Sequence, residues 1–375
     1  MRVLHIGKYY PPFLGGIEKV NYDLVEGLNK EKVKTDVFCF NHKTKTKTVI
    51  EEDSYKIIRT SLFTIKFSTP ISLSIFKNLL RIYKDYDIIH IHMPNPIAAL
   101  AFQFLPYKGK IILHWHLDIV KQKTLKVIYK PFQTHLLKKA DAIIVTSLEY
   151  LNHSKDLKPF LKKCHVIPIG IDNYYLKENL EFRKKLQQKY QGKKIIFSLG
   201  RLIYYKGFEY LIEAAKELDD DCIIFIGGLG PLKESLEIQI QKSDLEDKVK
   251  LIGKIPESEI GEYYHSATLF CLPSIERSEA FGIVLVEAMS CGCPLISTAM
   301  GSGTSWVNKN NNTGLVVPAK DASEMALAIQ KIVKENTLRN TFSKNCLFRF
   351  KNEFRLETMI QRALKLYRDM FEKNN

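Results

Sequence analysis

The chain has 375 residues, more than one hydrophobic core usually supports, so we expect two domains. Apolar residues make up 45% and charged residues 26%, as in ordinary globular proteins, and no apolar run reaches the roughly 18 residues of a membrane-spanning helix. The formal net charge is +15. It is uneven, because residues 1–172 hold 27 basic and 15 acidic residues, a net of +12, and residues 173–375 hold 29 and 26, a net of +3.

Continuously apolar runs alternate with amphipathic stretches along the chain, which predicts parallel sheets with crossover helices. The strands predicted in the first half are Val3–Gly7, Thr35–Phe40, Ile88–His92, Lys110–His114, Ala142–Val145 and His165–Ile167. Those predicted in the second half are Lys194–Leu199, Cys222–Gly227, Val249–Leu251, Leu269–Leu272, Pro294–Ser297 and Gly314–Val317. The fold class is therefore α/β, with two Rossmann-like parallel-sheet domains.

The domain boundary is expected near Ile169–Tyr174, ahead of a charged stretch and a new strand–turn–helix series. We assign residues 1–172 to an N-terminal domain and residues 173–375 to a C-terminal domain, with the last helix packing back on the first. Open parallel sheets bind ligands beyond the carboxyl ends of their strands. We therefore expect a site in a cleft between the two domains.

Two motifs in the first half follow predicted strands. Gly15-Gly16 precedes a predicted helix over Glu18–Leu28, and two glycines permit close approach of the backbone to a ligand, although a plain loop entering a helix explains them equally well. His114-Trp115-His116 follows the strand Lys110–His114, and we favour His116 as a group that contacts a sugar or a developing negative charge. The sequence offers no third metal ligand with suitable spacing, so we expect no metal site.

Gly200-Arg201 and Lys206-Gly207 lie between a predicted strand and a predicted helix that begins near Phe208. A strand, a glycine turn and a helix N-terminus form a common phosphate-binding arrangement. The Arg201 guanidinium and the Lys206 ammonium add positive charge. A solvated basic pair is the alternative explanation of the same residues.

Glu279 and Glu287 flank the turn Phe281-Gly282, after which a helix is expected to begin near Ile283. Glu279 would then lie in the loop and Glu287 inside the helix, where a carboxylate can accept hydrogen bonds from ribose or sugar hydroxyls. The alternative, a surface glutamate, is weakened for Glu287 because its neighbours are apolar and a buried charge needs partners.

The segment Val120–Lys139 alternates lysines with apolar residues, and such a basic amphipathic stretch can lie on an anionic membrane surface. A surface helix with a solvated basic face is the alternative. The short polar N-terminus does not resemble a signal peptide, so we expect a cytoplasmic protein, with contact at the inner face of the cytoplasmic membrane.

Together these residues resemble the signature of retaining glycosyltransferases of family 4, which have the GT-B fold. The resemblance covers nearly the whole chain and includes Gly15-Gly16-Ile17-Glu18, Ile167–Asp172 and Glu287–Pro294 beside the motifs above. The segment Gly301–Asn308 resembles a branch that builds bacterial surface polysaccharides, often with mannose-type donors.

The resemblance implies a role for each matched residue. Arg201 and Lys206 would hold the donor diphosphate, Glu279 the donor sugar and Glu287 the ribose, while His116 would lie near the reacting sugar. Gly15 and Gly16 would approach the phosphate, and the backbone at Phe281, Gly282 and Ile283 would complete the donor site. Lys254 and Ile255 would recognise the base. The C-terminal domain would bind the donor and the N-terminal domain the acceptor, with no cofactor and no metal.

The leading hypothesis is a retaining hexosyltransferase that moves a sugar, with mannose as the favoured candidate, from a nucleotide-diphosphate sugar to a lipid-linked or membrane-proximal glycan acceptor in surface polysaccharide or lipopolysaccharide assembly. A nucleotide-sugar epimerase on the same fold and a non-catalytic nucleic-acid binder are the alternatives. No nucleic-acid-binding module is visible, so we expect no nucleic-acid partner. The donor base, the sugar, the acceptor and the oligomeric state stay open.

Overall fold

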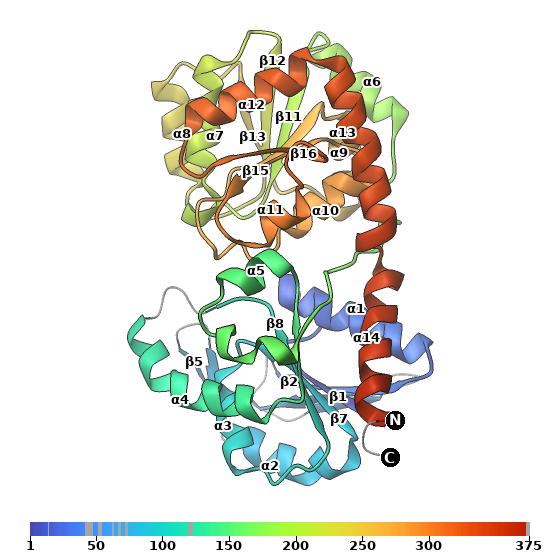
Figure 1. The fold of residues 1–375 in the computed structure, drawn as a ribbon. Coiled ribbons are helices and arrows are strands. Elements are labelled where there is room, and N and C mark those ends of the chain that lie inside the picture. Colours follow the sequence, from blue (N-terminus) through green and yellow to red (C-terminus); the bar gives the residue numbers. More distant parts are fainter. Residues whose placement is uncertain are drawn as a thin grey trace. The chain divides into compact units, whose positions relative to one another are not determined.

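The computed structural model describes residues 1–372 except residues 14, 42–47, 52–54, 62–63, 67–68, 72–73 and 119–122; of residues 48–51, 64–66, 69–71, 123–126 and 128 it describes the backbone. The chain forms two compact units (Figure 1). The N-terminal unit comprises Met1–Thr146, Ser154–Ile169 and the segment from Leu356 onward. The C-terminal unit comprises Ser147–His153 and Gly170–Arg355.

The N-terminal unit is built on an eight-stranded sheet of order β10-β9-β8-β7-β1-β2-β4-β3. Its strands are parallel except β3, which pairs antiparallel with β4, and β5 and β6 form a separate antiparallel pair. The strands are β1 (Arg2–Ile6), β2 (Lys34–Phe40), β3 (Thr48–Glu51), β4 (Lys56–Thr60), β5 (Thr64–Lys66), β6 (Thr69–Ile71), β7 (Ile88–Met93), β8 (Lys110–Trp115), β9 (Ala142–Val145) and β10 (Cys164–Val166).

The helices of the N-terminal unit are α1 (Gly16–Lys30), α2 (Ser74–Ile82), α3 (Pro96–Phe104), α4 (Lys123–Lys139) and α14 (Leu356–Glu372). The last helix, α14, packs beside α1 (Figure 1). Their close approach depends on Gly27, since a Cβ atom there would lie 2.1 Å from Cδ1 of Ile360. The end of the chain therefore shares the core of the N-terminal unit.

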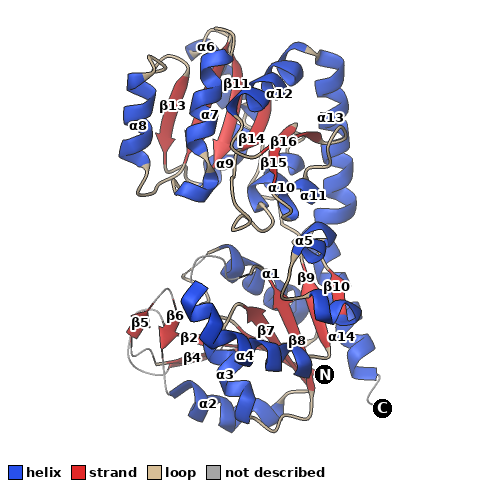
Figure 2. Cartoon of the chain, turned by 60° about the vertical axis from the view of Figure 1, so that its left-hand side comes forward, coloured by secondary structure: helices blue, strands red, loops and turns tan. Residues whose placement is uncertain are grey.

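The C-terminal unit is built on a six-stranded parallel sheet of order β13-β12-β11-β14-β15-β16. Helices α7, α8 and α12 cover one face in a core that includes Ile212, Leu236 and Ile329, and the ring of Phe197 packs on α9 from the other (Figure 2). The strands are β11 (Lys194–Leu199), β12 (Cys222–Gly227), β13 (Val249–Gly253), β14 (Leu269–Leu272), β15 (Leu295–Ala299) and β16 (Gly314–Pro318). The helices are α5 (Leu148–His153), α6 (Leu180–Lys189), α7 (Phe208–Ala214), α8 (Lys233–Lys242), α9 (Glu257–Ser266), α10 (Ile283–Ser290), α11 (Gly303–Val307), α12 (Ala322–Lys334) and α13 (Asn336–Arg349).

The α/β class and the two parallel-sheet units confirm the prediction from the sequence, and every predicted strand is present with its ends shifted by at most a residue or two. The prediction missed β3, β4, β5 and β6. These strands are short and rich in Thr and Lys, and all four lie in antiparallel pairs, so they lack the continuous apolar runs of strands buried on both faces.

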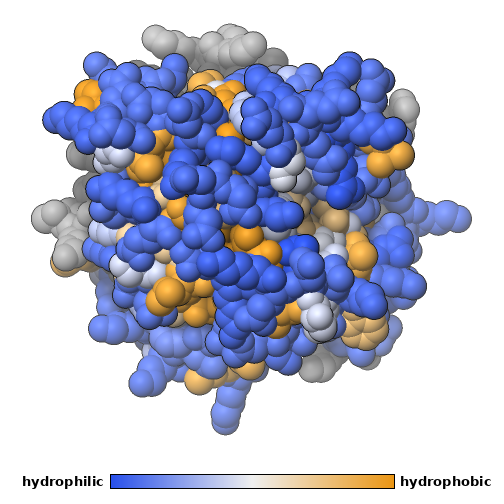
Figure 3. Space-filling view, turned by 90° about the horizontal axis from the view of Figure 1, so that it is seen from above, coloured by the Kyte–Doolittle hydropathy of each residue, from blue (hydrophilic) through white to orange (hydrophobic). Residues whose placement is uncertain are grey.

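The surface is mainly polar on the face that Figure 3 displays, where hydrophobic residues form small separate patches. Among the residues that the structure describes, no helix has both the length and the apolar character needed to cross a membrane.

Candidate functional site

The strand order of the C-terminal unit reverses between β11 and β14. From β11 the chain moves outward through β12 and β13, and it then returns to the other side of β11 to build β14, β15 and β16. In open α/β sheets, ligands bind beyond the carboxyl ends of the strands at such a switch point. The segments that follow β11 and β14 carry the residues that the sequence predicts to bind the phosphate and the sugar of a ligand.

The segment after β11 turns back over the sheet before α7 begins. Gly200 donates its N–H to Gly227 O at 3.0 Å, and a short 3-10 helix, Tyr204–Lys206, precedes Gly207. Gly207 has φ +66°, and a Cβ atom there would lie 2.2 Å from Pro273 O. Glycine therefore lets the segment after β11 approach the segment after β14, and α7 begins at Phe208 as predicted.

This approach brings Lys206 and Glu279 together. Lys206 Nζ lies 2.5 Å from Glu279 Oε2, and the two side chains are only 10% and 12% exposed. Ser274 Oγ donates to the same carboxylate oxygen at 3.2 Å. Arg201 is exposed, with Nη2 3.4 Å from Tyr205 Oη. The site thus contains one cation already paired and a second cation that faces solvent.

Glu287 lies within α10, which begins at Ile283 as predicted, after Gly282 at φ +79°. The carboxylate is partly buried and accepts hydrogen bonds from Tyr264 Oη at 2.8 Å and Tyr175 Oη at 3.2 Å. Burial raises the pKa of the carboxyl, while the two phenols oppose that shift. The sequence indicated that this glutamate needs partners but did not identify the two tyrosines.

Three further candidates for donor contact differ in the exposure of their side chains. Phe281 is buried, and its ring packs against Trp306 and Phe354, so only its backbone is free to meet a ligand. Lys254 is exposed and Ile255 is buried, directly after β13. The N–H of Gly228 donates to Gly253 O at 2.7 Å, which joins this segment to the one after β12.

In the N-terminal unit, Gly15 and Gly16 form the start of α1. Gly15 is the N-cap residue with φ −116°, and its carbonyl accepts from Lys19 N at 2.9 Å. Neither glycine has the positive φ that the sequence pattern allowed. Gly16 is exposed, which leaves its backbone open to a ligand.

His116 is 4% exposed and lies in a row of buried histidines rather than on an open surface. Its Nε2 is 2.9 Å from Nδ1 of His92, and the ring stacks on His114 with centroids 4.1 Å apart. Burial lowers the pKa of His116 to about 3, so the imidazole is neutral at physiological pH. The structure therefore allows His116 to act as a neutral hydrogen-bonding group and not as a cation.

Comparisons with known sequences agree with the motifs. Residues 14–173 match the family described as "Glycosyltransferase Family 4", and residues 179–346 match "Glycosyl transferases group 1". The chain is 33% identical to O-antigen chain mannosyltransferase C of Escherichia coli, over all of both chains. It is 28% identical to D-rhamnosyltransferase WbpZ of Pseudomonas aeruginosa, over 94% of this chain and 92% of that one.

Comparisons with solved structures agree on the fold. Sucrose-phosphate synthase from Thermosynechococcus elongatus superposes with a TM-score of 0.80 at 23% identity, covering 99% of each chain. Anabaena HepE in complex with UDP superposes with a TM-score of 0.78 at 19% identity, covering 98% of this chain and 100% of that one. Two parallel-sheet units with these neighbours constitute the GT-B fold.

Proposed function

This chain belongs to glycosyltransferase family 4 and is a glycosyltransferase, and we propose that it is a retaining hexosyltransferase of surface polysaccharide assembly. The donor in this proposal is a nucleotide-diphosphate sugar with a mannose-type sugar, which the names of the E. coli and P. aeruginosa relatives support. The observation that carries the donor site is the Lys206–Glu279 pair at the switch point of the C-terminal sheet. It supplies a cation and a carboxylate within 2.5 Å of each other.

The donor diphosphate is held by Lys206 and Arg201 in this proposal. Departure of the nucleoside diphosphate leaves negative charge on its oxygens, and fixed cations in a partly buried site stabilise that charge more strongly than water does. Arg201 is exposed and is therefore free to close on the phosphates. In this proposal the two cations stabilise the departing diphosphate without a metal ion.

The other donor contacts in this proposal are those that the family resemblance implies. Glu287 accepts hydrogen bonds from the ribose hydroxyls, in place of or beside those from Tyr264 and Tyr175. The exposed segment at Lys254 recognises the base. Glu279 contacts the sugar, while the backbone at Gly282 and Ile283 and at Gly15 and Gly16 lies against the donor. Neutral His116 donates or accepts a hydrogen bond near the reacting sugar.

The reaction exchanges one bond at the anomeric carbon for another. The bond to the diphosphate oxygen breaks, and the acceptor oxygen forms its bond on the same face through an oxocarbenium-like state. Because attack and departure share that face, the departing phosphate oxygen is the base nearest the acceptor hydroxyl, and it takes the proton. The products are a glycoside of unchanged anomeric configuration and a nucleoside diphosphate.

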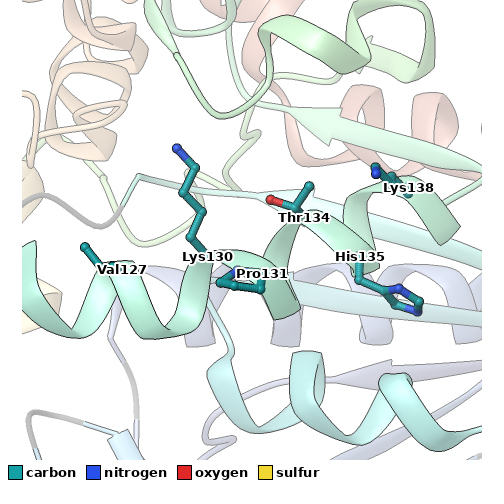
Figure 4. A pocket seen from close by; sticks show the side chains of 6 residues that line it. All are labelled: Val127, Lys130, Pro131, Thr134, His135 and Lys138. Carbon is teal, nitrogen blue, oxygen red and sulfur yellow. The ribbon is translucent and has the colours of Figure 1, made fainter.

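The acceptor is proposed to be a lipid-linked or membrane-proximal glycan, bound by the N-terminal unit at the cytoplasmic face of the membrane. This unit carries most of the net positive charge. Helix α4 has a surface hollow lined by Val127, Lys130, Pro131, Thr134, His135 and Lys138 (Figure 4). The side chain of Val127 is 72% exposed beside the basic residues, a combination that suits an anionic lipid surface.

Calorimetric titration of the purified chain with UDP, GDP and ADP, and then with the corresponding sugar nucleotides, tests the donor assignment. We expect tight binding of one nucleotide, unchanged by EDTA. Failure of every nucleotide to bind would overturn the assignment, and loss of binding in EDTA would overturn metal-independence at the diphosphate. Nuclear magnetic resonance of the product's anomeric proton tests retention.

The same assay separates transfer from epimerisation. A transferase consumes the donor sugar only with an acceptor, apart from slow hydrolysis, whereas an epimerase converts the donor alone into an isomer. Appearance of an isomeric sugar nucleotide without acceptor would replace the proposed reaction with the alternative.

A further inference from the structure

Five buried histidines line one face of the N-terminal sheet where β1, β7 and β8 lie side by side. The parallel register pairs His5 with His90 and His92 with His114, and side chains two residues apart on a strand share a face. None is more than 4% exposed; the five are His5, His90, His92, His114 and His116. Side chains of α1 and α14 cover the row.

Three of these rings lie close enough for one ion to bind them once the ring of His90 turns, since it now stacks on His5 with centroids 4.2 Å apart. His5, His90 and His92 each offer a ring nitrogen, and these nitrogens lie within 4.8 Å of one another. Nδ1 of His5 and Nε2 of His92 are 3.2 Å apart. Two nitrogens bound to one tetrahedral ion at about 2.0–2.1 Å are separated by about 3.3 Å, so this pair needs almost no movement.

The other nitrogen of each of these rings is held from outside. Tyr367 Oη lies 3.0 Å from Nε2 of His5 and is also hydrogen-bonded to Nδ1 of His90. Nδ1 of His92 lies 2.9 Å from Nε2 of His116. Histidine ligands of metals characteristically use their second nitrogen in such a bond, which fixes the ring orientation. The inward nitrogens are therefore His5 Nδ1, His90 Nε2 and His92 Nε2.

The inward side of the row is only partly hydrogen-bonded, because His5 Nδ1 meets His92 Nε2 and Asn21 Oδ1 whereas the inward nitrogen of His90 meets no partner in the described structure. Within the described part of the chain, His90 Nε2 and Asn21 Nδ2 are buried without a partner, and Asn21 Oδ1 lies 3.0 Å from His5 Nδ1. A buried polar atom without a partner costs about 1–3 kcal/mol, and in native proteins it often marks an ion or water.

We propose that His5, His90 and His92 bind one divalent transition-metal ion of the zinc class, with Asn21 Oδ1 or a water in the fourth position. Imidazole nitrogens suit zinc and its neighbours in the first transition row. The ion joins β1 to β7 and, through Tyr367, holds α14 on the sheet. A second triad, His92, His114 and His116, shares His92, but both ring nitrogens of His114 are without a hydrogen-bond partner in the described part of the chain, so no outer bond orients that ring.

This site is distinct from the donor site, and among the described residues its one hydrogen bond to a proposed donor residue is that between His92 Nδ1 and His116 Nε2. The sequence pointed only to His114 and His116 as a pair and excluded a metal for want of a third ligand. The ligands of the proposed site were not recognisable as a motif because His5 and His92 are 87 residues apart. The bound ion would link the two strands at the switch point of the N-terminal sheet, since β1 lies between β2 and β7.

The test uses the full chain without an affinity tag, grown with Zn²⁺. Metal content is measured on the protein as purified, and Co²⁺ is titrated into chelator-treated protein, since its visible absorption reports nitrogen coordination. We expect about one ion per chain, competition between Co²⁺ and Zn²⁺, and a higher Tm with Zn²⁺. His90→Gln and His92→Gln should abolish binding, whereas His153→Gln, at an exposed histidine of α5, should leave it unchanged.

Tyr367→Phe keeps all three ligands and removes only the phenol, and it should weaken Co²⁺ binding by roughly 10–100-fold. This variant tests the proposal even if a histidine variant does not fold. Absence of metal in the purified wild type together with no Co²⁺ uptake would overturn the proposal and leave a buried water as the occupant. Full binding in folded His90→Gln and His92→Gln chains would overturn it equally, whatever the transferase activity.

Discussion

Lys206 Nζ and Glu279 Oε2 lie 2.5 Å apart at the carboxyl ends of β11 and β14, the two strands between which the order of the C-terminal sheet reverses. The pair is largely shielded from water, so its charges interact more strongly than surface charges do. A donor diphosphate that reaches Lys206 would compete with Glu279 for the ammonium. Glu279 would then be free to accept hydrogen bonds from the sugar.

Lys206→Ala should lower kcat by roughly 10²–10³, because it removes a preorganised cation from the departing diphosphate. It also leaves the Glu279 carboxylate partly buried without its ion pair, so Tm should fall as well. Steady-state kinetics and thermal unfolding measure the two effects. Adding Glu279→Gln to this variant should restore part of the Tm without restoring kcat.

The matched control is Lys216→Ala, which breaks the exposed Lys216–Glu213 ion pair in the same unit. Exposed pairs contribute about 0–1 kcal/mol, so both kcat and Tm should stay near wild type. Wild-type turnover in Lys206→Ala would remove this residue from the catalytic assignment.

Arg201→Ala should separate activity from stability. Arg201 is exposed, and its contact within the described structure is a 3.4 Å approach to Tyr205 Oη, so its loss should leave Tm unchanged. The kcat should nevertheless fall by roughly 10²–10³, as for a lost charge-stabilising group. Normal kcat together with normal donor affinity would mean that the guanidinium does not reach the diphosphate.

Glu287→Gln should raise the KM for the donor more than it lowers kcat, because ribose contacts lie away from the reacting bond. The amide keeps one acceptor oxygen for Tyr264 or Tyr175, so the fold should persist. Donor affinity by calorimetry measures the loss, for which we expect about tenfold, the equivalent of one hydrogen bond to a charged group. An unchanged affinity would contradict the ribose assignment.

The difference in stability between wild type and Glu287→Gln should also change with pH in a defined direction. The pKa of Glu287 is raised by burial above its ordinary value of 4.5, so the unfolded state ionises first as the pH rises. The stability that this carboxyl contributes is full below pH 4.5 and is lost as the pH rises through its folded pKa. Tm of wild type minus Tm of Glu287→Gln should therefore fall from pH 4 to pH 7.

Glu181→Gln is the control for this pH profile, because the pKa of Glu181 is lowered rather than raised. Glu181 is exposed on α6, and Lys185 lowers its pKa, so the difference in Tm should be small and should change in the other direction with pH. Parallel pH profiles for the two variants would show that burial does not govern Glu287.

The elements of the fold that the sequence predicted are those with continuous apolar runs. The strands Ile88–His92 and Leu269–Leu272 are surrounded by other strands or helices on every side, and their composition alone indicates burial. The apolar-run criterion did not predict β3 and β4. These strands form an antiparallel pair at the edge of the sheet, where polar residues are tolerated. The starts of α7 and α10 were predictable because a glycine at positive φ precedes each.

The candidate site was predictable where its residues directly follow a strand, as Arg201 and Lys206 follow β11 and Glu279 follows β14. Its partners from distant segments were not. Tyr264 reaches Glu287 from α9 and Tyr175 from the segment before α6, and no spacing rule connects either tyrosine to that glutamate. Neighbours in a parallel sheet are separated by long crossovers, so local patterns indicate which residues end a strand but not which residues meet.

Val127→Asp combined with Lys130→Glu should weaken binding to vesicles that contain an anionic phospholipid. A basic residue near such a surface contributes about 1 kcal/mol, so the charge reversal Lys130→Glu should by itself cost roughly thirtyfold in affinity. Val127→Asp adds a further negative charge and removes the exposed valine, so the loss for the double variant should be larger still. Co-sedimentation with the vesicles measures this affinity. Lys121, Lys123 and Lys126 also belong to the basic segment Val120–Lys139 that the sequence predicts to meet a membrane, but their side chains lie outside the described residues.

Lys184→Glu, at an exposed position of α6 in the C-terminal unit, is the control for net charge. It should bind vesicles as wild type does, and neutral vesicles should bind none of the three proteins. Equal binding of the double variant and wild type would remove α4 from the membrane contact.

Gly207→Ala tests whether the close approach of two segments positions Lys206. Gly192 and Gly207 have φ values of +72° and +66°, so alanine at either position incurs the left-handed backbone cost of about 1–2 kcal/mol. Gly192 has no atom within 4 Å of the added Cβ, whereas at Gly207 that Cβ would lie 2.2 Å from Pro273 O and the segments after β11 and β14 must separate. Gly207→Ala should therefore lower Tm more than Gly192→Ala does, and it alone should lower kcat, since separation moves Lys206 from Glu279. Equal losses of Tm in the two variants, with kcat unchanged in both, would show that the approach of these segments does not set the geometry of the site.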